Sequence, residues 1–416
     1  MADLIIKNAK VVTCESSGPK KGKDMQELGI IEKGFVAVKD DIIEAVGETG
    51  WESLAEEGCQ IIDAAGKLVM PGLVDPHTHL VHYGSRENEL ELKLKGVPYV
   101  EIARAGGGIL STVRATRGAS KEQLTEKMVG SLDEMLSWGT TTVEAKSGYG
   151  LDFETEVKCL EVLRDVKHPV DIVRTYLGAH AVPEEYKTRR REYIDLMLNK
   201  VIPYVAQNKL AEFIDCFVEE GFYSLEEGEE ILLKGREYGL GIKLHGDEIE
   251  PMGGAELAGR LHAISAEHLV AASDEGIEEM KKGGTIPIIL PGTSFYLRLG
   301  KFARGKEMIE KGLAIALATD YNPGTCPTES LQSIMVFASM GMGLTPQQVI
   351  SAMTINSAYA IGRGDTVGSL EKGKKADILI MNAMNENYIV YHFGINHVNT
   401  VIKNGRVVIK DGKKLY

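Results

Sequence analysis

Between residues 68 and 364, short apolar runs alternate with amphipathic stretches of helical period. Eight such alternations over about 300 residues are what a (β/α)₈ barrel requires. An open doubly wound sheet is the rival, but the first run is not followed by the Gly-rich phosphate turn of that fold. The eight predicted strands are Leu68–Val74, Thr140–Ala145, Val170–Leu177, Phe213–Val218, Gly241–Leu244, Ala263–Ala266, Thr285–Leu290 and Leu313–Ala318.

Several of the intervening helices have start signals that can be read directly. A Ser or Thr followed three residues later by Gln or Glu forms a capping box, which satisfies backbone donors at a helix start. Gly139 is expected to end the first of these helices. The three boxes are Ser120-x-x-Gln123, Ser224-x-x-Glu227 and Thr345-Pro346-x-Gln348.

The two ends of the chain resemble each other in pattern. Residues 7–12 and 403–408 are both β-rich runs broken by an Asn, and Asn404-Gly405 is a two-residue hairpin signal. We predict a small β-sandwich domain from residues 1–67 and 365–416, with the barrel domain, residues 68–364, inserted between them. Two unrelated hairpins attached to a core are the alternative. Further strands are expected at Phe35–Lys39, Ile42–Val46, Ala376–Met381 and Arg406–Ile409.

Composition narrows the functional class. The 416 residues are 44% hydrophobic and carry a formal net charge of −13, which disfavours a nucleic-acid binder. The five cysteines form no C-x-x-C pair, a pattern that suits a reducing compartment. No signal peptide and no apolar run of about 18 residues is visible, so no membrane partner is expected. These features favour a cytoplasmic enzyme that acts on a small molecule.

Ionisable residues gather where the predicted strands end, which is where barrel enzymes carry their chemistry. Five of the ten histidines lie at these points. The other five are interpreted as ordinary polar residues. The strand ends are Asp75-Pro76-His77-Thr78-His79, Gly178-Ala179-His180, Leu244-His245-Gly246-Asp247-Glu248, Ala266-Glu267-His268 and Ala318-Thr319-Asp320.

Four of these residues predict a metal site. His77 and His79 alternate along an extended segment, so both imidazoles point to one side. His245 alone would favour a structural histidine and Asp320 alone a helix cap, but together they converge at one end of one barrel. Three nitrogens and one carboxylate suit Zn²⁺ or Fe, with a coordination position left open for water. We expect one ion per chain and cannot choose between the two metals.

The segment Pro71–His79 resembles the first-strand signature of the amidohydrolase superfamily. The terminal β domain and Asp320 after the eighth strand are also similar to that superfamily. A longer series resembles one branch of it, the imidazolonepropionase family of cyclic amidohydrolases. This series comprises Gly84-Ser85-Arg86-Glu87, Gly106-Gly107-Gly108-Ile109, Lys146-Ser147-Gly148-Tyr149-Gly150, Leu177–Pro183, Lys243–Glu248 and Ala318–Thr325.

The resemblance implies hydrolysis of 4-imidazolone-5-propanoate to N-formimidoyl-L-glutamate in histidine degradation, by attack of metal-activated water on the ring carbonyl. It assigns His77, His79, His245 and Asp320 to the metal. Gly246 and Tyr321 depart from the family, where Ala and Phe are expected, but neither departure removes an ionisable group. The residues expected to contact substrate are Arg86, Tyr149, His180, Glu248, Asn322, Gly324 and Thr325.

Three residues are expected to move protons or stabilise charge. Glu248 follows His245 by three residues on the same loop, so it can approach the metal without binding it. His268 comes from the next strand and can stabilise an oxyanion or relay a proton. Asp320 can alternate between ligand and base, and the sequence does not decide between it and Glu248 as the general base, although Glu248 is favoured.

The substrate carboxylate calls for a cation, and Arg86 can hold it with two parallel N–H donors. The alternative for Arg86 is a surface pair with Glu87 or Glu89. Tyr149 is expected on a flexible loop that closes over a ligand, or else as an exposed loop aromatic. His180 is expected to hydrogen-bond the ring carbonyl or its neighbour. The turn Asn322–Thr325 is expected to offer free backbone donors to a carboxylate.

Two other functions stay open at this point. A purine or pyrimidine deaminase of the same superfamily would keep the metal residues and would not need Arg86. A non-enzymatic scaffold should lack metal ligands, whereas this sequence has all of them. A homodimer is expected because it is the commonest assembly.

Overall fold

A computed structural model describes residues 1–97, 101–102 and 105–416. Its centre is an eight-stranded parallel sheet in the order β13-β12-β11-β10-β9-β8-β7-β6. Every predicted barrel strand has an observed counterpart. The strands are β6 (Leu73–Thr78), β7 (Thr140–Lys146), β8 (Asp171–Ala179), β9 (Phe213–Val218), β10 (Gly241–Gly246), β11 (Ser265–His268), β12 (Ile286–Ile289) and β13 (Ala316–Leu317).

The barrel closes where its first strand meets the segment that follows its last. Thr78 bridges Tyr321 in parallel, and the His79 N–H donates to the Tyr321 carbonyl over 2.9 Å. Deeper in the seam, Asp75 accepts hydrogen bonds from the N–H and the hydroxyl of Thr319, at 3.2 Å and 2.6 Å. This seam sets the two histidines of the first strand beside the aspartate that follows the eighth.

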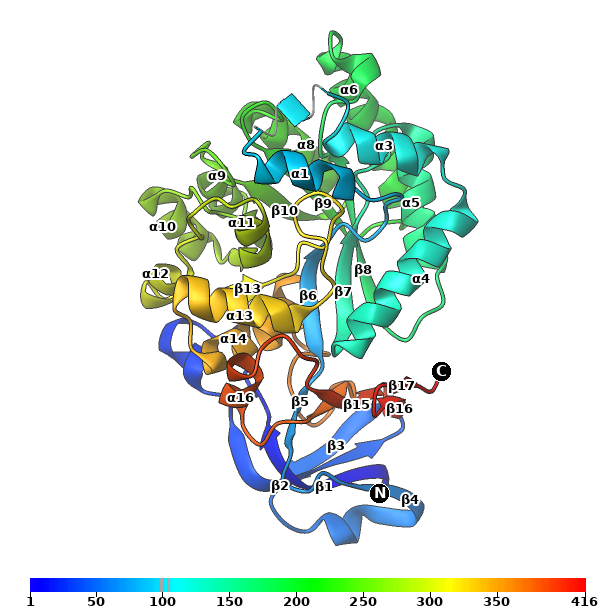
Figure 1. The fold of residues 1–416 in the computed structure, drawn as a ribbon, viewed down its shortest axis with the longest axis vertical. Helices are drawn as coiled ribbons and strands as arrows, with labels where there is room; N and C mark the ends of the chain where they lie inside the picture. The colour runs from blue at the N-terminus through cyan, green and yellow to red at the C-terminus, as the bar shows by residue number, and fades with distance from the viewer. Residues whose placement is uncertain (98–100, 103–104) are drawn as a thin grey trace.

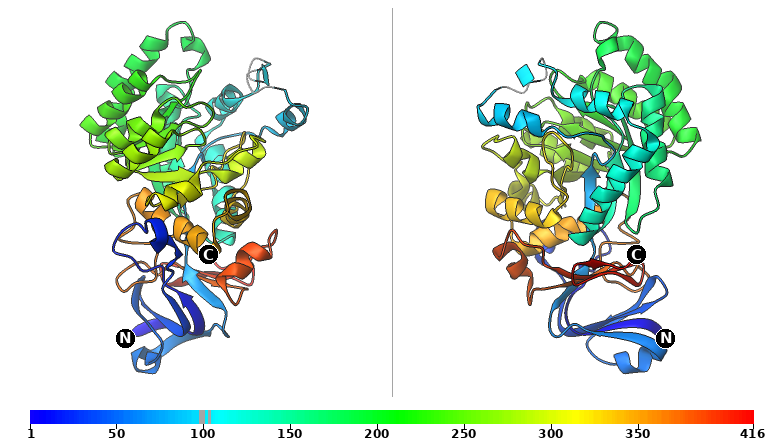
Figure 2. Two further views of the ribbon diagram at one scale, coloured as in Figure 1. Left: turned by 90° about the vertical axis from the view of Figure 1, so that its left-hand side faces the viewer. Right: turned by 45° about the vertical axis from the view of Figure 1, so that its right-hand side comes forward.

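Helices surround the barrel, as Figures 1 and 2 show. The three predicted capping boxes are confirmed, at the starts of α4, α8 and α14. The helices are α1 (Leu90–Leu94), α3 (Ile109–Gly118), α4 (Lys121–Ser137), α5 (Phe153–Asp165), α6 (Arg190–Leu196), α7 (Ile202–Gln207), α8 (Leu225–Glu237), α9 (Gly254–Arg260), α10 (Asp274–Gly283), α11 (Pro291–Tyr296), α12 (Gly305–Glu310), α13 (Leu331–Met342), α14 (Pro346–Met353), α15 (Ile355–Ala360) and α16 (Glu386–Tyr391).

Both ends of the chain build a second sheet below the barrel (Figure 1). Its strands follow one path, β17-β16-β15-β14-β5-β1-β2-β3, and β4 pairs with β1. The sequence predicted a small β-sandwich from both termini, and the structure has a β domain from both termini whose strands belong to one sheet. The two ends share this sheet, so they are not unrelated hairpins. The strands are β1 (Ala2–Val12), β2 (Ile30–Lys39), β3 (Ile42–Gly47), β4 (Ala55–Asp63), β5 (Leu68–Pro71), β14 (Ile378–Met381), β15 (Val398–Lys403), β16 (Arg406–Lys410) and β17 (Lys413–Lys414).

The predicted first barrel strand was wrong in one respect. Residues 68–74 form two strands, because β5 pairs with β1 and β14 in the terminal sheet while β6 opens the barrel. A continuous apolar run does not reveal a change of partner sheet in its middle. The division into domains at residues 67 and 364 stays a prediction.

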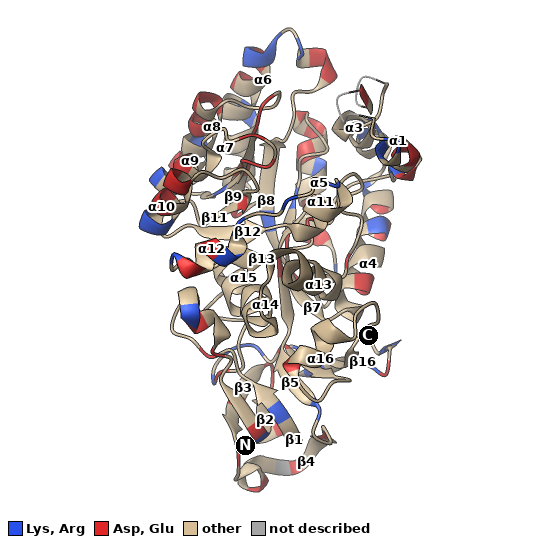
Figure 3. Cartoon of the chain, turned by 60° about the vertical axis from the view of Figure 1, so that its left-hand side comes forward, with Lys and Arg blue, Asp and Glu red and all other residues tan. Residues whose placement is uncertain are grey.

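The core contains one large apolar cluster that fills the space between the barrel strands and the surrounding helices and continues into the terminal segments, where it includes Val12, Leu379 and Val401. A second cluster lies within the terminal sheet. Charged side chains are spread along the outer helices α8 to α10, whereas α13 has none (Figure 3). Within the described residues, no helix combines the length and the apolar character that crossing a bilayer requires.

Candidate active site

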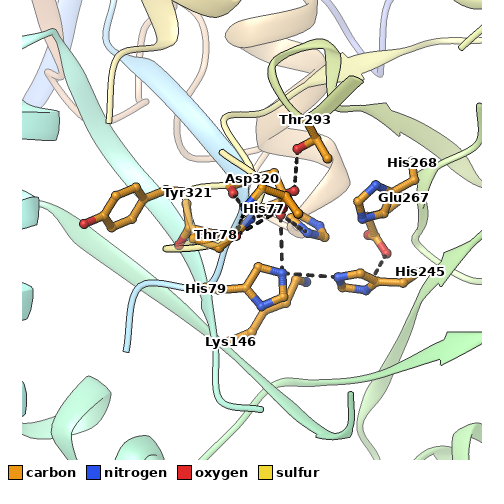
Figure 4. Close-up of polar contacts among 12 residues, drawn as sticks. His77, Thr78, His79, Lys146, His245, Glu267, His268, Thr293, Asp320 and Tyr321 are labelled. Atoms are coloured by element: carbon orange, nitrogen blue, oxygen red, sulfur yellow. Dashed lines mark hydrogen bonds and ion pairs between the residues drawn. The ribbon is translucent and has the colours of Figure 1, made fainter. Parts of the chain in front are cut away.

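The structure brings the four predicted metal ligands together at one end of the barrel (Figure 4). Asp320 Oδ1 lies 3.3 Å from the Nε2 atoms of both His77 and His79. His245 Nε2 lies 3.4 Å from His79 Nε2. Ligand atoms placed about 2.0–2.1 Å from a tetrahedral Zn²⁺ are themselves about 3.3–3.4 Å apart. The observed separations therefore match those around one ion.

Several polar atoms of this cluster lack a hydrogen-bond partner in the described part of the chain. Among the described residues, both ring nitrogens of His77 and the Oδ1 of Asp320 are buried without a hydrogen bond. Burial lowers the pKa of His77 and His245, and lowers that of His79 to about 3, so the rings are neutral at pH 7. Neutral imidazoles and a carboxylate aimed at one point fit a metal ion, because an orphaned buried polar atom is otherwise costly.

A second layer of residues, which the sequence did not single out, fixes His245. Asp215 on β9 lies 2.9 Å from His245 Nδ1 and also accepts the backbone N–H of His245 over 3.1 Å. Lys146 contacts Asp215 over 2.9 Å and Glu144 over 2.7 Å, and these three side chains are fully buried. A carboxylate on the far nitrogen holds a ligating histidine in one orientation and raises its basicity.

Asp320 is held in a conformation that few residues adopt. Its φ is +54°, in the left-handed region, and the Thr293 hydroxyl donates to its Oδ2 over 2.6 Å. Such backbone strain persists only where surrounding contacts determine it. Oδ2 is thus engaged, while Oδ1 faces the histidines.

Glu248 and His268 lie together beside the metal cluster. Glu248 Oε1 is 3.6 Å from His268 Nδ1, and both side chains are buried. Burial, with the carboxylates of Asp320 and Glu219 nearby, raises the pKa of Glu248 to about 8. Burial lowers the pKa of His268. At this separation the carboxyl and the imidazole are not hydrogen-bonded, and one water between them would carry a proton from one to the other.

A cavity of about 240 Å³ opens in front of this cluster. Apolar side chains wall it, among them Phe217 on β9 and Phe222 in the segment after β9, whose ring centroids lie 4.4 Å apart. His77 and Gly324 are the predicted site residues that do not line it. Those that do are His79, Arg86, Tyr149, His180, His245, Glu248, His268, Asp320, Asn322 and Thr325.

Arg86 forms an ion pair with Glu89, one of the two acidic neighbours that the sequence offered as alternative partners. Its Nε and Nη2 donate to the two carboxylate oxygens of Glu89 over 2.9 Å and 2.8 Å. The pair is buried rather than on the surface, and Lys93 on α1 lies 3.4 Å from the same carboxylate. Two formal positive charges thus face one negative charge. Beside them, a β-carbon on Gly324 would collide with Arg86 Nη1, so any larger residue there would displace the Arg86 guanidinium.

Tyr149 and His180 form one wall of the cavity. Tyr149 is only 2% exposed, so its interpretation as an exposed loop aromatic was wrong. His180 Nδ1 is 3.0 Å from the Gly148 carbonyl, which requires Nδ1 to be the donor and leaves Nε2 as the acceptor. Burial lowers the pKa of His180 to about 3, so the ring is neutral at pH 7.

The turn after Asp320 corrects a prediction. Its backbone donors were expected to be free for a carboxylate, but Asn322 Oδ1 accepts the N–H groups of Gly324 and Thr325 over 2.8 Å and 2.7 Å. Asn side chains commonly bond the backbone two residues on, and that local partner competes with a ligand. The side chains of Asn322 and Thr325 still line the cavity.

Comparisons with known proteins agree with this architecture. Profiles of the amidohydrolase family match residues 60–135 and 238–408. Among solved structures, a 5-methylcytosine deaminase from Klebsiella pneumoniae superposes with a TM-score of 0.74 at 18% identity, covering 99% of this chain and 98% of that one. An adenosine deaminase from Xanthomonas campestris with bound zinc has a TM-score of 0.69 at 18% identity, covering 100% and 94%. At such identities these likenesses show the fold alone.

Sequence relatives are much closer. The imidazolonepropionase of Alkaliphilus metalliredigens (strain QYMF) is 52% identical over 419 residues, covering 99% of each chain. That of Alkaliphilus oremlandii (strain OhILAs) is 53% identical over 416 residues, again covering 99% of each. That of Bacillus cereus (strain G9842) is 51% identical over 414 residues, covering 99% of this chain and 97% of the relative. The chain therefore belongs to the imidazolonepropionase family of the amidohydrolases.

Proposed function

We propose that this chain hydrolyses the ring amide of 4-imidazolone-5-propanoate, giving N-formimidoyl-L-glutamate in histidine degradation. The observation that carries the proposal is one cavity that combines a set of metal ligands with a buried cationic group seven residues after His79. A planar ring fits between the histidines and the aromatic wall, and the propionate then reaches Arg86. The family relatives, matched over nearly their whole length, support the same substrate.

The metal ligands are His77, His79, His245 and Asp320, and we propose one Zn²⁺ or Fe ion per chain. When bound, such an ion polarises a carbonyl as a Lewis acid and lowers the pKa of water. The paired Asp215 keeps His245 oriented toward it.

We propose that Glu248 and His268, which lie beside the metal cluster, carry out proton transfer. We assign Glu248 as the general base that takes a proton from the attacking water and later delivers one to the departing ring nitrogen. His268 lies 3.6 Å from Glu248 and stabilises the developing oxyanion or relays the proton. Asp320, whose pKa burial raises, is the alternative base.

Substrate positioning follows from the remaining cavity residues. Arg86 and Lys93 both lie against the Glu89 carboxylate, and this pair of cations suits a propionate in a chain whose net charge is −13. His180 and Tyr149 flank the ring position. Further contacts are assigned to the side chains of Asn322 and Thr325, whereas Gly324, whose N–H donates to Asn322, does not line the cavity.

The direct experiment is to follow hydrolysis of freshly prepared 4-imidazolone-5-propanoate, with N-formimidoyl-L-glutamate detected as the product. Turnover that a chelator abolishes and that Zn²⁺ or Fe restores supports the proposal. Metal-loaded protein that leaves this substrate intact but deaminates a purine or pyrimidine would replace it with the deaminase function. The cytoplasmic location and the homodimer stay predictions, to be checked by fractionation and by sedimentation.

Changing Arg86 to Met tests recognition of the propionate. Charge-assisted hydrogen bonds contribute about 1.5–3 kcal/mol, so we expect KM to rise about 10- to 100-fold with kcat little changed. Steady-state kinetics with the substrate, and with an analogue that lacks the carboxylate, measure this. The matched control is Lys95→Met, which removes an exposed cation after α1 that pairs with Glu91. Equal KM values for the R86M variant and the wild-type chain would contradict the assignment.

A further inference from the structure

Glu219 is a buried carboxylate that no step above uses. It follows β9 directly, its exposure is 2%, and it neither belongs to the metal cluster nor lines the cavity. Its neighbour Glu220 is exposed. An acidic side chain is rarely buried so completely unless its oxygens are hydrogen-bonded.

The partners of Glu219 are four backbone amides: that of its neighbour Glu220, which donates to Oε1 over 3.2 Å, and three consecutive amides of the loop that follows β10. Its Oε2 accepts from the N–H groups of Glu248 and Ile249 over 3.0 Å and 3.1 Å, and its Oε1 accepts from Glu250 over 3.2 Å. Hydrogen bonds to an ionised acceptor are about twice as strong as neutral ones. One side chain thus fixes the backbone on which Glu248 stands.

The other side of the same loop is fixed independently. Asp247 has φ of +51° and accepts the N–H groups of Gly253, Gly254 and Ala255 at distances between 2.8 Å and 3.1 Å. These bonds tie the loop to the start of α9 and do not reach the backbone of residues 248–250. The conformation of Glu248 therefore depends on Glu219, which comes from a different strand.

We propose that Glu219 is a positioning residue that holds the Glu248 carboxyl at its place beside His268. The role rests on the proposed function, because Glu248 is the proton-transfer group there. Glu219 touches neither substrate nor metal ligands in this arrangement. Three titratable groups face Glu248, namely Asp320, Glu219 and the His268 ring.

The test replaces one carboxylate oxygen by a donor. In Glu219→Gln, the new amide NH₂ group faces two backbone N–H groups in either orientation, so two of the four hydrogen bonds are lost. We expect kcat to fall about 10- to 100-fold, the range typical of a partner that orients a reacting group, while metal content stays unchanged. We expect KM to change by less than about threefold. Glu220→Gln removes the same charge one residue away and should leave kcat unchanged.

A double-mutant cycle separates positioning from a general structural effect. If Glu219 acts through Glu248, then adding Glu219→Gln to a Glu248→Gln chain lowers kcat by no more than about twofold. A further tenfold loss in that background would overturn the proposal, as would a single variant with the kcat of the wild-type chain.

Amide hydrogen exchange of residues 248–250 gives a readout that does not depend on substrate. Exchange should be faster in Glu219→Gln than in the wild-type chain or in Glu220→Gln, with the thermal midpoint measured alongside. Unchanged exchange overturns the proposal even if the chain hydrolyses the imidazolone. Faster exchange in a chain that never turns over this substrate would retain the placement of Glu248 and reject the proposed substrate.

Discussion

Replacing Glu248 by Gln should lower kcat for imidazolone hydrolysis by about 10²- to 10⁴-fold, the usual contribution of a positioned acid or base. The substitution keeps the shape of the side chain and removes its ability to exchange a proton. Because Glu248 is outside the metal cluster, elemental analysis should find the same metal content as in the wild-type chain. Glu250→Gln, an exposed residue two positions along the same loop, is the matched control.

The same variant has a signature in the pH profile. Burial and two neighbouring carboxylates raise the pKa of Glu248 from 4.5 to about 8 in the metal-free chain, and a bound cation lowers it again. A general base works in its ionised form, so kcat/KM should rise with pH through an apparent pKa between these two values. That rise should be absent in Glu248→Gln. A variant that keeps both the rise and the rate would assign the base role to Asp320.

The barrel could be predicted because its signals are local. Most strands are apolar runs, three of the helices begin with a capping box, and the polar residues that matter come where a run ends. In a parallel barrel all strand ends lie at one rim, so His77, His245 and Asp320 converge however far apart they are in sequence. The convergence of the metal ligands therefore follows from their positions at the ends of barrel strands.

The contacts between polar side chains on different strands could not be predicted, because no local sequence pattern encodes them. Asp215 and Lys146 lie within strands, where a charged residue looks like an interruption of the apolar run until the fold brings the two together. Glu219 follows β9, and the amides of residues 248–250 that donate to it follow the neighbouring strand β10. Arg86 offered two acidic neighbours in sequence, and only the three-dimensional arrangement selects Glu89 and buries the pair.

The prediction that the turn at Asn322 offers free backbone donors was wrong for a related reason. A sequence of Asn, Pro, Gly and Thr predicts a tight turn correctly, and tight turns do expose backbone donors. Whether a ligand or the Asn side chain takes those donors depends on one rotamer, and here the side chain takes them. Recognition of the propionate therefore depends more on Arg86 and Lys93 than on the backbone of this turn.

Replacing His245 by Ala should remove both metal and turnover. His245 supplies one of the three nitrogens of the cluster, and Asp215 and Lys146 behind it are arranged around its ring. A metal ion contributes several kcal/mol to transition-state stabilisation. Its loss corresponds to a rate about 10³-fold lower or more. Metal per chain and kcat should be measured together, after dialysis against a chelator and refilling with Zn²⁺ or Fe.

Two further variants make this result specific. His262→Ala removes an exposed histidine outside the cluster and should keep full metal content. Asp215→Asn keeps all four ligands but weakens the orientation of His245, so metal affinity should fall about 10- to 100-fold and excess metal should restore activity. If His245→Ala retained one ion per chain with normal turnover, the metal would have to lie elsewhere, and the four-ligand cluster would have to be abandoned.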